Sequence, residues 1–183
     1  GGRYPSRLLQ DLAARMPFYD RTLEYVFVTQ PNFYNYGALP EVLERYTIGT
    51  VWTNGHHNLS AAYKALHAAL DKSTLHLEVG AGNLWVTPDG VRVEALNPQT
   101  KPSIADRWGD MALVLRITYG DVSFLLTSDA NPRAQAAMLE AGLEVRADVL
   151  QIPMHGTEFS LDPAFYTAVG ADALALQADP ANL

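Results

Sequence analysis

The sequence predicts an α/β fold in which two β-sheets form a sandwich and helices cover the outside. Three observations carry this prediction: helices and strands alternate in the first third, short β segments dominate the middle, and β/α units return at the end. The expected strands are 23–29, 48–53, short runs between 75 and 97, 112–118, 122–127, 149–153 and 173–176.

The expected helices follow from apolar spacing and from residues that begin or end a helix. The first helix is expected to start at a Ser6 cap and to carry one apolar face, made of Leu8, Leu9, Leu12 and Met16. Further helices are expected at 39–46, at 59–70, after Asn131-Pro132 up to Gly142, and after Asp162-Pro163 up to Gly170.

Two β segments have distinctive patterns. Residues 23–29 are apolar apart from Glu24 and the final Thr29, which favours a central strand rather than a half-exposed one. Residues 112–118 and 122–127 are joined by Tyr119-Gly120-Asp121 and predict a hairpin, and Pro88-Asp89-Gly90 marks an earlier turn.

Composition limits the class of protein. The 183 residues are 48% hydrophobic and 18% charged, which is typical of a globular chain with a sizeable core. No repeat or interior linker is visible, so one domain over 1–183 is expected. The chain has no cysteine, so no disulfide or thiolate ligand is available. A net charge of −7 disfavours strong non-specific DNA binding, which requires clustered Lys and Arg, although it leaves room for a local basic groove.

The most informative stretch is 29–37 (TQPNFYNYG), which lies between the strand 23–29 and the helix 39–46. A strand end that opens onto a helix is where α/β folds commonly build their sites. This one offers amides and aromatic rings, which are poor ligands for zinc or manganese. No nucleophile elbow, phosphate-binding loop or dinucleotide fingerprint competes with it elsewhere in the chain.

Several motifs, in the same order, resemble the metallo-β-lactamase-type domain of the ComEC family of DNA-uptake (competence) proteins. The stretch 29–40 resembles the family's T-H-P-D-A-D-H-x-G-G-L-P run, and 123–130 (SFLLTSDA) resembles its F-L-L-T-G-D-A. The stretch 147–157 (ADVLQIPMHGT) resembles A-D-V-L-K-x-x-H-H-G-S, and 113–120 (LVLRITYG) resembles S-L-V-L-R-L-x-Y-G. The resemblance covers nearly the whole chain and implies the αββα metallo-β-lactamase-like sandwich. It also implies a fragment of a longer domain or protein, without the first strands of the family's domain.

The resemblance places the family's metal motif, H-x-D-x-D-H, on four residues that have lost every ligand: Gln30, Asn32, Tyr34 and Asn35. Tyr34 cannot replace a carboxylate near neutral pH, because a tyrosine hydroxyl ordinarily has a pKa of about 10. No metal is therefore predicted, although the family would use zinc or manganese. The aromatic residues Phe33, Tyr34 and Tyr36 are expected to fill the vacated volume, with base stacking as the alternative.

Three residual candidates for chemistry remain elsewhere: Asp129, His155 and Asp110. By resemblance Asp129 stands where a carboxylate would bridge two metals, but a helix cap is the simpler interpretation. His155 keeps one of two adjacent family histidines, the other being Met154, and it either lines a residual pocket or is a hydrogen-bonded loop residue. Asp110 is otherwise a solvated residue at the start of a strand.

The remaining histidines give weaker signals. His56 and His57 are adjacent, and adjacent side chains rarely converge on one ion, so metal binding there is not expected. His67 on the third helix and His76 in a strand are expected to be surface or edge residues.

Three functions follow from these expectations. The favoured one is a catalytically degenerate structural or DNA-contacting module of a ComEC-type DNA-uptake protein. The alternatives are a metal-dependent phosphodiesterase or nuclease with a rebuilt site, and a protein-interaction domain with an exposed sheet edge. The resemblance implies single-stranded DNA and a membrane channel of the same longer protein as partners. It also implies a membrane-associated, extracytoplasmic location in bacteria.

Overall fold

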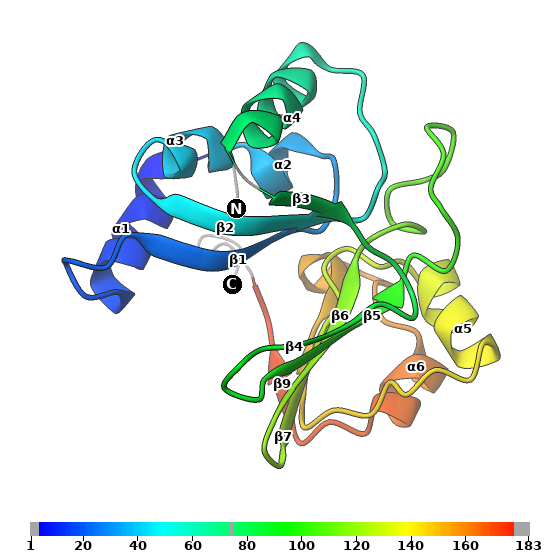
Figure 1. Ribbon diagram of the computed structural model, residues 1–183. Helices are drawn as coiled ribbons and strands as arrows, with labels where there is room; N and C mark the ends of the chain where they lie inside the picture. The colour runs from blue at the N-terminus through cyan, green and yellow to red at the C-terminus, as the bar shows by residue number, and fades with distance from the viewer. Residues whose placement is uncertain (1–3, 74, 178–183) are drawn as a thin grey trace. The chain divides into compact units, whose positions relative to one another are not determined.

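The computed structural model describes residues 4–73 and 75–177, and the side chains of 71–73 are not described. The chain divides into two compact units, residues 1–78 and 79–183, which are drawn in one view in Figure 1. Whether the two units make up the single domain expected over 1–183 depends on how they are joined, so that expectation stays a prediction.

The first unit contains a parallel sheet of three strands with helices packed on it (Figure 1). The strand order is β1-β2-β3, with β1 at Thr22–Val28, β2 at Thr47–Thr53 and β3 at Leu75–Glu78. The helices are α1 (Pro5–Arg15), α2 (Phe33–Tyr36), α3 (Leu39–Leu43) and α4 (Ala61–Ser73). Val28 and Val51 of the sheet are buried against Leu39 of α3 and Leu66 of α4, and these contacts form the core of the unit.

Two expectations for the first unit are wrong. Tyr4, not Ser6, occupies the cap position of α1, because Pro5 starts the helix and needs no N–H partner there. Strand β1 is not central: among the described residues it pairs only with β2 and forms an edge of its sheet. Its continuous apolar run has another cause, since Val28 is buried in the core while Tyr25 and Phe27 both contact the Trp52 ring.

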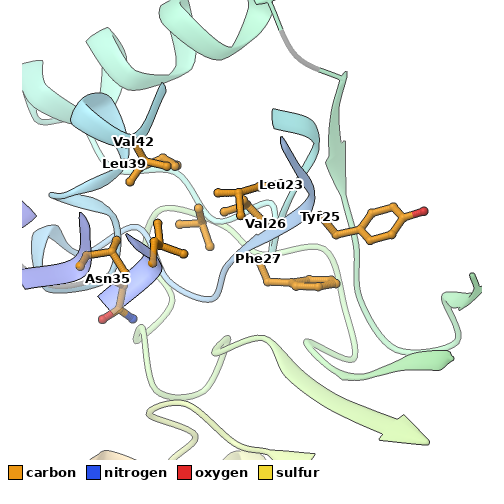
Figure 2. Close-up of a pocket in the computed structure, with 10 residues that line it drawn as sticks. Leu23, Tyr25, Val26, Phe27, Asn35, Leu39 and Val42 are labelled. Atoms are coloured by element: carbon orange, nitrogen blue, oxygen red, sulfur yellow. The ribbon is translucent and has the colours of Figure 1, made fainter. Parts of the chain in front are cut away.

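An apolar hollow of about 250 Å³ lies in this unit beside β1. In Figure 2, side chains of β1 such as Leu23 and Val26 lie on one side of it and Leu39 and Val42 of α3 on another. Asn35 contributes an amide to the lining.

The described part of the second unit contains a mixed sheet of six strands, two α-helices and a short 3-10 helix, η1 (Pro153–Gly156). The strand order is β4-β5-β6-β7-β8-β9, made of Leu84–Val86, Arg92–Asn97, Val114–Tyr119, Val122–Leu126, Val149–Gln151 and Ala173–Ala175. Strands β4 to β7 pair antiparallel, and β7, β8 and β9 pair parallel. Helices α5 (Pro132–Glu140) and α6 (Pro163–Val169) pack on this sheet through Met138 and Phe165, which are fully buried with Leu125 and Leu150.

The turns and helix ends predicted for the second unit are largely confirmed. The hairpin β6–β7 turns at Gly120, and Gly90 has the positive φ expected after Pro88-Asp89. Asp162 caps α6 by accepting hydrogen bonds from two backbone N–H groups, and Gly170 ends this helix in the left-handed conformation. No described helix is both long and apolar enough to cross a bilayer.

Candidate functional site

The loop after β1 carries the four positions where the sequence resemblance places a metal motif, and its polar side chains hold the loop itself together. Gln30 is 2% exposed, and its Oε1 accepts a hydrogen bond from Asn32 Nδ2 at 3.4 Å. Asn32 caps α2, because its Oδ1 accepts from the Tyr34 backbone N–H at 2.7 Å. Asn35 Nδ2 donates to Thr29 Oγ1 at 3.3 Å.

These contacts decide what the loop can do chemically. The amides of Asn32 and Asn35 bond within the segment 29–35, and Asn35 also borders the apolar hollow beside β1. Tyr34 is 60% exposed at the end of the loop. No carboxylate or imidazole belongs to the four positions, so this loop does not fit a catalytic metal ion.

The expected aromatic filling is wrong for two of the three residues. Tyr36 is buried, with its ring 5.2 Å from that of Tyr63, but Phe33 and Tyr34 are exposed. Phe33, three positions before Tyr36, lies on the same side of the single-turn α2, with its ring 5.7 Å from that of Tyr36, but its outer part stays exposed. Tyr34 follows directly and points away from that side.

In the second unit, the loops after β7 and β8 bring Asp129 and His155 together. His155 Nε2 lies 3.7 Å from Asp129 Oδ1, and His155 Nδ1 lies 3.0 Å from the Gln177 carbonyl. A carbonyl oxygen only accepts, so Nδ1 carries the proton in that contact, and Nε2 of the neutral ring is the nitrogen with the free electron pair.

The backbone around this pair is strained. Ser128, Met154 and His155 have φ values of 51°, 50° and 56°, in the left-handed region that side chains disfavour. Hydrogen bonds hold the two loops together, from the Met154 N–H to the Ser128 carbonyl at 3.0 Å and from the Ser128 N–H to Gln151 Oε1 at 3.1 Å. Strain of this kind persists only where the surrounding contacts fix it.

Asp129 and Asp110 do not have the simple structural roles expected for them. Asn131, not Asp129, caps α5 by accepting from the Ala134 N–H at 3.0 Å, since it immediately precedes the first helical residue. Asp110 lies well before β6 and is mostly buried, with a side chain 17% exposed. It accepts from Asn131 Nδ2 at 2.6 Å and pairs with Arg133 at 3.4 Å.

The second unit therefore offers two adjacent ligands, Asp129 and His155, while the Asp110 carboxylate is engaged by Asn131 and Arg133. A catalytic zinc site usually takes three protein ligands and a water molecule. Over residues 4–73 and 75–177, no three His, Asp or Glu side chains are already arranged to hold a metal ion. How Asp129 and His155 lie relative to the loop after β1 stays a prediction.

Sequence reasoning missed a group of histidines in the first unit. His67 is half-buried between neighbouring rings, 4.5 Å from the Tyr63 ring and 4.8 Å from the His76 ring, so it is not a simple surface residue. His76 does lie on an edge strand, as expected, and His57 approaches His67 from the loop after β2. The one available signal was the alternation of His76 and Glu78, which puts both side chains on one face of β3.

The comparisons with known proteins give the fold. No protein-family profile and no curated protein sequence matches the chain. The metallo-beta-lactamase fold protein YhfI from Bacillus subtilis matches with a TM-score of 0.59 and 11% identity, over 91% of this chain and 68% of that one. A point mutant of the beta-hydroxylase CmlA matches with a TM-score of 0.57 and 16% identity, over 88% of this chain and 37% of that one.

CmlA from Streptomyces venezuelae, a diiron beta-hydroxylase, matches with a TM-score of 0.50 and 17% identity, over 85% of this chain. The chain spans 29% to 37% of the two CmlA chains and about two thirds of YhfI. At these identities the likeness concerns architecture, not chemistry. Together with the two-sheet α/β structure, it confirms the predicted fold class: the chain has a metallo-β-lactamase-like fold.

Proposed function

We propose that this chain is a catalytically degenerate metallo-β-lactamase-like domain of a ComEC-type DNA-uptake protein. It serves as a structural or DNA-contacting module beside the membrane channel of a longer protein, on the extracytoplasmic side. The observation that carries the proposal is the state of the loop after β1. Asn32 and Asn35 lie at two of the family's metal-motif positions. Asn32 uses its side-chain oxygen to cap α2, and Asn35 donates a hydrogen bond to Thr29. The order of the matched motifs along the chain supports the ComEC assignment.

The lack of activity follows from what phosphodiester hydrolysis requires. The reaction needs an activated water molecule and a cation opposite the charge that develops on the phosphate. Gln30, Asn32, Tyr34 and Asn35 supply neither a base nor a carboxylate for a cation. The net charge of −7 also gives no general attraction for the substrate.

The decisive experiment is cleavage of a labelled single-stranded oligonucleotide with added manganese, magnesium or zinc. The parent protein is compared with an Asp129→Ala, His155→Ala double variant, which removes both retained ligands. Equal background from both proteins is the expected result. Metal-dependent turnover by the parent that disappears in the double variant would overturn the degenerate assignment.

DNA contact is tested separately from cleavage. Phe33 and Tyr34 are 48% and 60% exposed, and bases can stack on such rings. Fluorescence anisotropy with a single-stranded oligonucleotide at low salt should show weak, salt-sensitive binding that weakens in a Phe33→Ala, Tyr34→Ala variant. A Phe18→Ala, Tyr19→Ala variant is the matched control, because those rings are also exposed in the same unit. Equal affinity of all three proteins would exclude base stacking on Phe33 and Tyr34 and would leave a structural role for the domain.

A rebuilt hydrolase is the second candidate, and one observation favours it. Asp129 and His155 meet on strained backbone, and strained residues cluster at active sites. This candidate requires a third ligand, and Asp110 must leave Asn131 and Arg133 to become one. Tight zinc or manganese binding that is lost in Asp129→Ala and in Asp110→Asn would favour it over the degenerate module.

A protein-interaction domain is the third candidate. Strand β1 pairs on one side only among the described residues, so its other edge offers backbone groups to a further strand. A Val26→Pro variant that keeps its fold but loses a partner in pull-down experiments would favour this candidate.

A further inference from the structure

Three histidines and one glutamate of the first unit come together from three segments. His57 lies in the loop after β2, His67 on α4, and His76 and Glu78 on one face of β3. The centroid of the His67 ring lies 5.7 Å from that of His57 and 4.8 Å from that of His76. Imidazole is the side chain whose ordinary pKa, about 6.5, lies between pH 5 and 8. Mild acidification therefore changes the charge of this cluster while most other side chains keep theirs.

Glu78 can offset the charge of one protonated ring. His57 Nε2 lies 3.3 Å from Glu78 Oε1, so a proton on His57 completes an ion pair. A further proton on His67 places a second positive charge 5.7 Å from the first ring, on a side chain that is half-buried. Like charges repel strongly at this distance where protein excludes water, and a half-buried charge also loses hydration. The first proton therefore supports the packing of these segments, and further protons oppose it.

The hydrogen bond of His76 also opposes protonation of its ring. Thr53 Oγ1 lies 3.0 Å from His76 Nε2 and accepts from the Gly55 N–H at 3.4 Å. Beside the neutral ring, the Thr53 hydroxyl donates its hydrogen to the electron pair of Nε2. A proton on Nε2 reverses this bond, and the hydroxyl hydrogen then loses its acceptor at a position where Thr53 is 2% exposed. Acidification is therefore unfavourable on the β3 side of the cluster too.

Two tyrosines and a fourth histidine pack against the cluster. The ring of Tyr63 lies 4.5 Å from that of His67 and 5.2 Å from that of Tyr36 on α2. Burial, and after it the charge of Glu78, raises the pKa of Tyr63, so its hydroxyl is uncharged between pH 5 and 8. This hydroxyl donates to the carbonyl of His56, a fully buried histidine, at 3.1 Å. These three residues bring no negative charge that could balance a second proton.

Helix α4 is the element that a second charge would displace. It contacts β3 and is anchored in the core of the unit by buried residues such as Leu66. His67 follows Leu66 and is half-buried, so a charge on its ring gains hydration when α4 moves away from β3. The exposed Lys64 adds a positive charge one turn earlier. Asp71 and Lys72, whose side chains are not described, add one charge of each sign at the end of the helix.

We propose that His57, His67 and His76 make the packing of α4 on β3 sensitive to pH, so that the helix is packed at neutral pH and loosened below about pH 6. Once α4 has moved, the rings lie farther apart and take up protons without repulsion. The loosened state therefore binds more protons than the packed state, and the packed state loses stability as pH falls. The proposal concerns the first unit alone and requires neither a metal ion nor DNA, so it is independent of the function proposed above.

The test is hydrogen exchange of the backbone amides of α4, measured by mass spectrometry at pH 7.5 and pH 5.5 and corrected for the intrinsic effect of pH on exchange. The opening constant of these amides should rise at least tenfold in the parent at the lower pH. The internal control is α5 in the second unit, which contains no histidine and should change far less. His67→Gln should remove most of the rise. His155→Gln, which removes a histidine from the second unit, should leave the rise intact.

Two further variants separate charge from packing. Glu78→Gln should move the rise to higher pH, because the charge on His57 is then not offset. An increase of the same size at both pH values would instead mean that Glu78 is a structural contact, and it would contradict the role given to its charge. His57→Gln should reduce the rise while α4 keeps its packing, because the His57 side chain is 56% exposed.

Two results would overturn the proposal. One is an opening constant of α4 in the parent that is the same at pH 7.5 and pH 5.5. The other is a rise of full size in both His67→Gln and His57→Gln, which would place the acid sensitivity of α4 outside the cluster. Circular dichroism at pH 7.5 establishes that each variant is folded before its exchange is compared with that of the parent.

Discussion

The loop after β1 and the loops after β7 and β8 are the places where the sequence resemblance puts metal motifs, and they differ in their backbone. The four motif positions of the first loop hold no carboxylate or imidazole, and Asn32 is an ordinary helix cap. In the second, Asp129 and His155 remain, and the neighbouring Ser128, Met154 and His155 itself have positive φ. Phe159 is the fourth non-glycine residue of the described chain with positive φ, and it too lies in the second unit.

The difference lies in what each backbone does with its polar side chains. In the loop after β1, the amides make hydrogen bonds within the loop itself. In the loops after β7 and β8, a carboxylate and an imidazole are presented on strained backbone. Hydrogen bonds between the loops after β7 and β8 maintain the strained backbone. Matched substitutions in these loops and in the loop after β1 should therefore change the free energy of unfolding by different amounts.

The largest expected effect is at the threonines that follow the two strands. Thr127 is fully buried and its Oγ1 donates to the Gln151 carbonyl at 2.6 Å, whereas the bond that Thr29 Oγ1 accepts from Asn35 is longer, at 3.3 Å. Thr127→Val should lower the free energy of unfolding by about 1 to 3 kcal/mol, because a buried acceptor loses its partner. Thr29→Val should cost well under half of that. Urea denaturation measures both, and equal losses would remove the contrast between the two places.

The helix caps next to the two sites give the second comparison. Asn32→Ala removes the cap of the single-turn α2, and Asn131→Ala removes the cap of α5 together with the bond to Asp110. A lost Asn cap costs about 1 kcal/mol, so Asn131→Ala should cost more than Asn32→Ala in thermal unfolding. A larger loss from Asn32→Ala would mean that the first loop carries more of the stability than its contacts indicate.

Backbone strain in the second unit can be tested at Phe159, whose side chain is 83% exposed. Its φ of 60° favours glycine, so Phe159→Gly should raise the free energy of unfolding by about 0.5 to 1 kcal/mol relative to Phe159→Ala. The alanine variant controls for the lost ring. If alanine proves as stable as glycine, the left-handed conformation at this position carries no cost.

Much of the fold could be predicted from the sequence, because the residues that begin and end its helices act on neighbouring backbone groups. Asn131-Pro132, Asp162-Pro163 and Gly170 act on neighbouring backbone groups, and each bounds a helix as predicted. The edge position of β1 could not be predicted in the same way. An apolar run indicates that both faces of a strand are covered, but it does not indicate whether both edges are paired.

The candidate sites were harder to predict, because they depend on contacts between distant segments. Whether Asp129 or Asn131 caps α5 is decided by a difference of two positions, which the sequence left ambiguous. The approach of His57, His67 and His76 requires the packing of α4 on β3, which no local pattern specifies. A resemblance in motif order predicted the fold class, since motif order reflects topology, while function stays a proposal.

The smallest expected effect is a pH dependence that belongs to the second unit. Asp148 accepts from Ser123 Oγ at 2.7 Å and from the Ser123 N–H at 2.6 Å. These bonds to the side chain and backbone of Ser123 hold the pKa of the Asp148 carboxyl below its usual range. The folded state therefore binds this proton less readily than the unfolded state, so the stabilisation is complete above the unfolded pKa and is lost as pH falls through the folded pKa.

The free energy of unfolding, measured from pH 6 down to acid, should fall more steeply in the parent than in Asp148→Asn. Ser123→Ala should fall between them, because it removes the hydroxyl and keeps the backbone N–H. Parallel pH profiles for parent and Asp148→Asn would mean that this half-buried carboxylate gains nothing from Ser123, and that the acid sensitivity of the chain arises elsewhere.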